Sequence, residues 1–251
     1  MSARARSRTA LIVSPHPDDA ALSLGGSILG CARLDIIVWN VFSHQSYSLI
    51  DREPEAAQRR ILQEESDVAT ALGTRVVMGG FAEAELRGYV RLSQRFGQDE
   101  GGVLGRPDER GVIDGVRAAF ERLLADVRPA VVGVPAGIGG HVDHLIACHA
   151  ALACLPHAHR ARATFLYEDL PYALNAGWRT RRLAELDARG LRLRERLMPI
   201  GASLARKRQA LEIYRSQLRP RDIRDVIGYG EELGGASGGA ERIWRLSAQA
   251  R

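Results

Sequence analysis

Short apolar runs alternate with longer helical patterns along most of this chain. The runs are continuous and rich in Val, Ile and Leu, which is typical of strands buried on both faces of a parallel sheet. This order predicts an α/β fold, a three-layer αβα sandwich with a Rossmann-like, mostly parallel sheet and right-handed crossovers. The expected strands are residues 9–15, 35–42, 75–81, 130–135 and 163–168, and the expected helices are residues 19–33, 54–72, 112–127, 142–155 and 201–218.

The length of 251 residues suits one domain, residues 1–251, with a full hydrophobic core. Residues 82–111 break the alternation, because they are rich in Arg, Gly, Gln and Glu. We expect an irregular insert there, of the kind that is usually functional or disordered. Residues 228–251 are expected to form a glycine-rich tail in which 241–246 could be an edge strand.

Composition narrows the classes of protein that the chain could be. A hydrophobic content of 45% is typical of a globular protein, and no apolar run is long enough for a transmembrane segment. The basic N-terminus lacks the apolar stretch of a signal peptide, so we expect a cytoplasmic protein. The net charge of +5 comes from scattered arginines, which favours no nucleic-acid partner. Three cysteines without metal-binding spacing, at 31, 148 and 154, are expected to be free thiols.

The segment Pro15-His16-Pro17-Asp18-Asp19 closes the first expected strand. Its prolines restrict the backbone, and two carboxylates suit the positive end of the helix that follows. His16 and Asp19 can converge on one point across this turn, while Asp18 is directed elsewhere. The alternative is that one of the two aspartates is simply a helix cap.

A second motif, Gly139-Gly140-His141-Val142-Asp143-His144, follows the strand expected at 130–135. His141 and His144 lie three positions apart at the start of a helix and share a face. Ligands of parallel sheets bind outside the carboxyl ends of the strands, so both motifs should meet at one edge. Two histidines with one carboxylate leave an open coordination position, as in catalytic zinc sites. The alternative is a loop with ordinary surface histidines.

These residues resemble the PIG-L/LmbE-like family of metal-dependent N-deacetylases. Its hallmarks are Pro-His-Pro-Asp-Asp-Glu after the first strand and His-x-x-His after a later one. Residues 21–26, 64–73, 167–172 and 207–217 also resemble elements of the family. The resemblance implies that fold for most of residues 9–218, together with hydrolysis of an N-acetyl group on an amino sugar, glycoconjugate or glycosylated metabolite.

The resemblance also implies a role for each motif residue. Asp18 would be the general base, and His141 would polarise or protonate the substrate. Asp143 would orient a neighbouring histidine, as carboxylates near metal sites do. The implied metal is Zn2+, with Fe2+ or Mn2+ as other divalent candidates, and its implied ligands are His16, Asp19 and His144.

The chain departs from the family pattern at two places. The usual glutamate after the paired aspartates is Ala20, and the usual arginine before the second-helix glutamate is Ile61, with Arg60 one position earlier. Residues 82–111 and 171–199 are expected to shape the substrate pocket, and the arginines of the insert permit an anionic substrate. The candidate substrate-binding residues are His44, Arg60, Arg87 and Tyr172.

Two other functions are open at this stage. Ala20 is compatible with a degenerate, non-catalytic family member that only binds sugars. His16, Asp18 and His144 also form the ligand set of a non-haem Fe(II) oxygenase, although such enzymes usually have an all-β fold.

Overall fold

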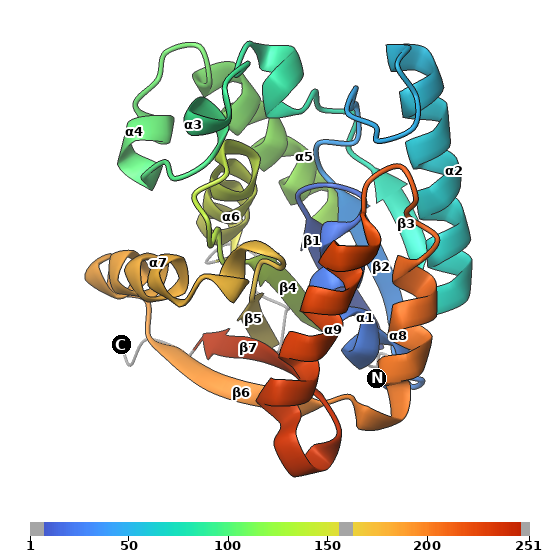
Figure 1. The fold of residues 1–251 in the computed structure, drawn as a ribbon. Coiled ribbons are helices and arrows are strands. Elements are labelled where there is room, and N and C mark those ends of the chain that lie inside the picture. The colour runs from blue at the N-terminus through green and yellow to red at the C-terminus, as the bar shows by residue number, and fades with distance from the viewer. Residues whose placement is uncertain (1–7, 156–162, 247–251) are drawn as a thin grey trace, which may run out of the picture.

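Figure 1 shows the structure, a computed structural model that describes residues 8–155 and 163–246. The described residues form one seven-stranded sheet, in which the first five strands of the chain run parallel. The last strand of the chain is antiparallel to both of its neighbours. The strands are β1 (Thr9–Ser14), β2 (Asp35–Asn40), β3 (Arg75–Met78), β4 (Val131–Pro135), β5 (Ala163–Tyr167), β6 (Leu193–Pro199) and β7 (Ala240–Leu246). Their order across the sheet is β3-β2-β1-β4-β5-β7-β6.

Helices cover both faces of this sheet, which confirms the expected three layers (Figure 1). The helices are α1 (Asp19–Gly30), α2 (Pro54–Leu72), α3 (Leu92–Arg95), α4 (Glu100–Leu104), α5 (Arg110–Val127), α6 (Val142–Cys154), α7 (Ala176–Ala188), α8 (Leu204–Leu211) and α9 (Pro220–Gly234). The described part of the chain also contains the short 3₁₀ helices η1 (Ala84–Arg87), η2 (Tyr172–Leu174), η3 (Gly201–Ser203) and η4 (Gly235–Ser237). Helices α1, α2, α8 and α9 pack together on one face, and α5 packs on α6 on the other.

The five expected strands all form, and the central ones bury their apolar side chains between the two helical layers, whereas β3 at the edge of the sheet is only partly buried. In β1, β2 and β4 nearly every residue is buried, as continuous apolar runs predict. The expected strands at 35–42 and 75–81 end earlier, at Asn40 and Met78. The chain after β2 nevertheless stays attached to the first turn, because the N–H groups of Val41 and Phe42 donate to the carbonyls of Ser14 and Pro15, both at 2.9 Å.

The C-terminal third differs most from the sequence prediction. The helix expected at 201–218 is only the short pair η3 and α8. The glycine-rich segment from 228 begins inside α9, and β7 lies one place in from the edge because β6 pairs with its outer side. Helix α7 and strand β6 were not predicted.

Residues 82–111 are more ordered than an irregular insert, since they contain η1, α3 and α4. A buried carboxylate, Glu100, fixes this segment to the rest of the domain. It accepts hydrogen bonds from Arg182 at 2.8 Å and from Arg189, and it lies 3.1 Å from Nδ1 of His149. The insert is therefore held against α6 and α7.

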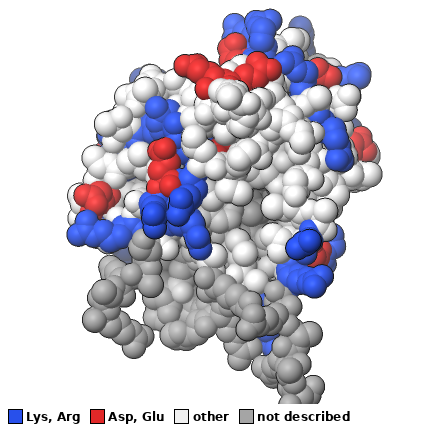
Figure 2. Space-filling view, turned by 90° about the horizontal axis from the view of Figure 1, so that it is seen from below, with Lys and Arg blue, Asp and Glu red and all other residues white. Residues whose placement is uncertain are grey.

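The surface in Figure 2 carries arginines in separate groups with acidic residues between them. Within the described ranges, no helix is long and apolar enough to cross a membrane. Cys31, Cys148 and Cys154 are free thiols, as expected. Residues 1–7, which carry the expectation about a signal peptide, and 247–251, the end of the expected tail, lie outside the described residues.

Candidate metal centre

The two histidine motifs meet at the carboxyl edge of the sheet because β1 and β4 are neighbours. Asp19 Oδ2 lies 3.2 Å from Nδ1 of His16 and 3.2 Å from Nε2 of His144. All three side chains are buried, and these three atoms lie within 4.8 Å of one another. Residues separated by more than 120 positions thus form one compact group of nitrogen and oxygen donors.

Local hydrogen bonds shape the first turn. The hydroxyl of Ser14 donates to the carbonyl of His16 at 2.6 Å and accepts from the N–H of Ala20 at 3.0 Å. The N–H of His16 donates to Asp19 Oδ2 at 2.8 Å. Asp18 occupies the N-cap position of α1, yet among the described residues its side chain makes no capping hydrogen bond. Helix capping therefore does not account for either carboxylate.

Each histidine of the group uses its second nitrogen to bind a carboxylate behind it. His16 Nε2 lies 2.8 Å from Asp143 Oδ2, and His144 Nδ1 lies 2.8 Å from Asp169 Oδ1. Asp169 also accepts the N–H of Ile138 at 2.9 Å. Such outer carboxylates fix the orientation of ligating histidines and raise their basicity.

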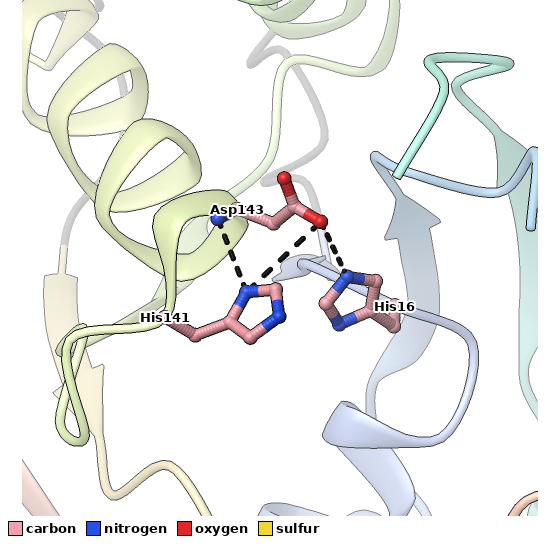
Figure 3. A group of neighbouring side chains, drawn as sticks. All are labelled: His16, His141 and Asp143. Carbon is pink, nitrogen blue, oxygen red and sulfur yellow. Dashed lines mark hydrogen bonds and ion pairs between the residues drawn. The ribbon is translucent and has the colours of Figure 1, made fainter. Parts of the chain in front are cut away.

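Figure 3 shows the carboxylate of Asp143 facing the rings of both His16 and His141. Its Oδ2 accepts the N–H of Ala84 at 2.9 Å as well as facing His16, and its Oδ1 lies 2.8 Å from Arg87. His16, His141 and Asp143 also lie close enough to hold a metal. However, the hydrogen bonds and the ion pair already occupy Asp143, so the group around Asp19 is the better metal site.

His141 has a fixed tautomer. The backbone N–H of Asp143 donates to His141 Nδ1 at 3.1 Å, so Nδ1 is an acceptor and the ring proton lies on Nε2. Burial also holds the pKa of His141 well below its usual value. His141 is therefore a neutral donor through Nε2.

The electrostatics of the group favour a cation between its members. Burial alone would lower the pKa of His144, but Asp19 and Asp169 raise it to about 9. Burial would likewise lower the pKa of His16, but its hydrogen bonds to Asp143 and Asp19 raise it well above its usual value. For Asp19 burial opposes ionisation, but the two histidines hold its pKa far below the usual range. These groups together attract positive charge.

A divalent metal fits the donors that are present. Among the described residues, the buried Nε2 of His144 has no hydrogen-bond partner, although it faces the Asp19 carboxylate. This nitrogen and Asp19 Oδ2 lie 3.2 Å apart, so a metal between them would take up both donors. Two imidazole nitrogens and one carboxylate oxygen are ligands that zinc prefers.

Asp18 differs from its neighbour in environment. It is partly exposed, and burial together with the adjacent Asp19 charge raises its pKa to about 7. The side chain of Asp18 makes no capping hydrogen bond to any described residue. The carboxylate that lies between the two histidines is that of Asp19. A carboxylate with a pKa near neutrality is suited to general-base chemistry.

The candidate substrate-binding residues lie in different surroundings. Tyr172 contacts the centre, with its ring centroid 5.2 Å from that of His144. Arg87 is half-buried behind Asp143 and also pairs with Glu109 at 3.2 Å. Arg60 is at the surface, where it binds Asp51 at 2.6 Å. His44 is exposed, and its backbone pairs with residue 82.

Two residues that contact the centre, Asp169 and Phe96, are not among the predicted site residues. Asp169 follows β5, so its place at the carboxyl end of a third strand was a usable signal. Phe96 packs edge-on against His141 with ring centroids 4.8 Å apart. Nothing in the irregular pattern around Phe96 indicated this contact.

Ala20 and Ile61, where the chain departs from the family pattern, are both buried. Ala20 contributes only its backbone N–H to the turn, and Ile61 lies in the apolar face of α2. Neither change removes a group from the donor set around Asp19.

The chain is similar to known proteins in sequence and in fold. A family model described as PIG-L, GlcNAc-PI de-N-acetylase, matches residues 11–155. The chain is 33% identical to 2'-N-acetylparomamine deacetylase of Streptomyces fradiae over 95% of this chain and 81% of the relative. The structure of the zinc inhibited form of teicoplanin deacetylase has a TM-score of 0.73 at 22% identity, with 96% and 100% of the two chains covered. A40926 pseudoaglycone deacetylase has a TM-score of 0.70 at 21% identity, with 98% and 100% covered. These two structures share the fold.

Proposed function

This chain belongs to the PIG-L family of de-N-acetylases, and we propose that it removes the N-acetyl group of an amino sugar with zinc held by His16, Asp19 and His144. The buried Nε2 of His144, which lies 3.2 Å from Asp19 Oδ2, carries this proposal. Asp169 occupies the other nitrogen of the ring, so Nε2 is left to face Asp19 and the metal. When bound, zinc would polarise the amide carbonyl and lower the pKa of a water molecule.

The remaining steps use this chain's own side chains. Asp18 takes a proton from the water molecule as its oxygen bonds to the acetyl carbon. The Nε2–H of His141 donates to the carbonyl oxygen as that oxygen gains negative charge. The C–N bond then breaks, and the proton held by Asp18 passes to the leaving nitrogen. The products are acetate and the free amine.

The ligand arrangement favours this hydrolase over a non-haem iron oxygenase. The oxygenase would use Asp18 as the carboxylate ligand, whereas Asp19 lies between the two histidines. Fe2+ or Mn2+ could replace zinc in the same three-ligand set, so metal content is part of the test.

A relative that matches 95% of this chain supports a proposal for the substrate class. That protein is named for 2'-N-acetylparomamine, and we propose an N-acetylated amino-sugar glycoside of antibiotic type for this chain. Such a substrate combines a small acetyl group with a much larger amine.

The test compares metal content and acetate release in three variants. His144→Ala should lose stoichiometric zinc and all acetate release from 2'-N-acetylparomamine. Asp18→Asn should keep zinc but lose at least about a hundredfold in kcat, since a positioned general base contributes on that scale. Asp67→Asn, which removes an exposed carboxylate of α2 outside the donor group, is the control and should keep both.

The pH profile gives a second readout. Asp18 acts only when deprotonated, so kcat/KM should rise with pH through the pKa of this carboxyl. Burial raises the pKa of Asp18 to about 7, and a cation bound nearby lowers it. The rise of kcat/KM with pH should therefore be centred below pH 7. Full activity in zinc-loaded Asp18→Asn, or zinc retained by His144→Ala, would contradict the proposal.

A further inference from the structure

A hollow of about 460 Å³ opens beside the metal centre. Its lining comes from two segments, the insert at 82–111 and the chain around η2 and α7. Large apolar side chains are exposed here, with Leu92 66% and Trp178 38% accessible. We call this surface the aromatic shelf, and all of its lining residues are uncharged: Leu92, Ser93, Phe96, Gly97, Tyr172 and Trp178.

The aromatic shelf is continuous with the proposed catalytic groups. Phe96 contacts the ring of His141 edge-on and lies 5.5 Å from the ring of Tyr172, measured between centroids. Tyr172 in turn contacts both His141 and His144. A substrate whose acetamide group reaches these histidines therefore lies next to the shelf.

The shelf is built from backbone that is fixed in place. The N–H groups of Gly97 and Gln98 donate to the carbonyls of Gly139 and Gly140 at 2.9 and 3.0 Å. A side chain at Gly139 would lie 2.6 Å from Cβ of Tyr172, so glycine allows this ring to lie directly on the loop. The shelf is thus preformed, which limits the entropy cost of binding to it.

We propose that the aromatic shelf binds the apolar face of the ring attached to the amino sugar away from the acetyl group, so that the shelf selects among glycosides by their aglycone. This inference rests on the proposed function. The methyl group of the acetyl is too small to cover the shelf. The part of the substrate beyond the amino sugar extends from the centre toward solvent and can lie on the shelf. Exposed, uncharged ring faces suit an aromatic aglycone or the apolar face of a neighbouring sugar.

The test uses zinc-loaded enzyme and two matched substrate series. The first series keeps the acetyl group and changes the aglycone, as methyl and phenyl N-acetyl-glucosaminides. The second keeps glucosamine and lengthens the acyl group from N-acetyl to N-octanoyl. We expect the phenyl glycoside to exceed the methyl glycoside about tenfold in kcat/KM, which corresponds to about 1.4 kcal/mol.

Trp178→Ala should reduce this phenyl-to-methyl ratio to about two or less, because an aromatic face of the shelf is lost. Leu197→Ala is the matched control, since Leu197 is also an exposed apolar residue but lies on β6. The control should keep the full ratio. Circular dichroism establishes that both variants are folded.

Several outcomes would overturn the inference. These are an equal rate for both glycosides, a ratio unchanged by Trp178→Ala, or a Trp178→Ala effect confined to the acyl series. If no substrate releases acetate, the proposed function fails, and calorimetric titration with methyl and phenyl glucosaminides then decides about the shelf alone. Tighter phenyl binding that Trp178→Ala removes would support the shelf, and equal binding would overturn it.

Discussion

At the residue scale, His16 uses its two ring nitrogens in different ways. Nδ1 faces Asp19 in the donor group, while Nε2 binds Asp143 behind it. Asp143 is itself held by Ala84 and Arg87 from the insert. The orientation of one metal-facing ring therefore depends on a segment that carries no metal ligand.

A buried carboxyl on α2 also supports the first turn. Glu65 accepts a hydrogen bond from Asn40 at 2.6 Å and another from the hydroxyl of Tyr214, and that hydroxyl also lies 2.8 Å from the carbonyl of Pro17. Burial raises the pKa of Glu65 to about 8.

Glu65 should therefore make stability depend on pH. Its folded pKa exceeds the unfolded value of about 4.3, so the folded state binds more protons, and the free energy of unfolding falls as pH rises from about 4.3 to 8. Glu65→Gln removes this titration and should make the slope less negative, by up to about 1.4 kcal/mol per pH unit. Urea denaturation of metal-free protein at pH 5, 6.5 and 8 measures the slope.

The control for that experiment is Glu55→Gln, which removes an exposed charge from the first turn of the same helix. The slope of this control measures how the loss of one negative charge on α2 alone changes the pH dependence of the free energy of unfolding. Identical slopes for Glu65→Gln and the natural protein would show that Glu65 does not titrate in this window.

The residues of the candidate site could be predicted only where short motifs carry them. His16, Asp19 and His144 stand at strand ends, where topology brings them together. Glu65 and Phe96 reach the same place through helices and loops whose path depends on packing among distant segments. No local pattern records such contacts.

At the element scale, the glycine pair before His141 determines how closely the insert approaches the site. Gly140 has φ +62°, and an added Cβ would lie 2.4 Å from the carbonyl oxygen of Gln98. This backbone atom cannot move away without shifting the segment that carries Phe96.

Gly140→Ala should therefore lower both stability and activity. Gly190→Ala is the matched control, because Gly190 has φ +83° but nothing within 4 Å of an added Cβ. The control should cost about 1 kcal/mol for left-handed backbone alone. Gly140→Ala should cost more than this and reduce kcat/KM at least tenfold.

Denaturation midpoints and initial rates of the two variants measure this difference. Equal destabilisation with unchanged rates would show that the insert is not tightly packed on the loop.

Elements with strong periodicity were predictable, and those without it were not. The central parallel strands β1 and β2 are buried on both faces, so their sequences are nearly continuously apolar. Strand β6 is largely exposed and contains three charged residues, so its sequence does not resemble a buried strand. Helix α9 buries Ile223, Val226, Ile227 and Gly230 at helical spacing, but its glycines favoured a loop assignment.

At the scale of the whole molecule, the donor group joins the two halves of the parallel sheet. His16 and Asp19 follow β1, and His144 belongs to the helix that follows β4. The group exists only when both halves are folded, so a metal bound there should stabilise the native state alone.

Removal of the metal should consequently lower the melting temperature. At free zinc one hundred times its Kd, the gain is about 2.7 kcal/mol, or roughly 5 to 10 °C for a chain of this size. Scanning calorimetry with EDTA and with added zinc measures the shift. His144→Ala should show no response to zinc, and an equal response from this variant would place the stabilising metal elsewhere.

The aromatic shelf and the donor group come from different parts of the chain. The donors follow β1 and β4, while the shelf comes from α3, η2, α7 and the residues beside them. Mutations that reshape the shelf need not alter the group that holds the metal. Descendants of one ancestral enzyme can therefore diverge in the molecules they accept while inheriting the same reaction.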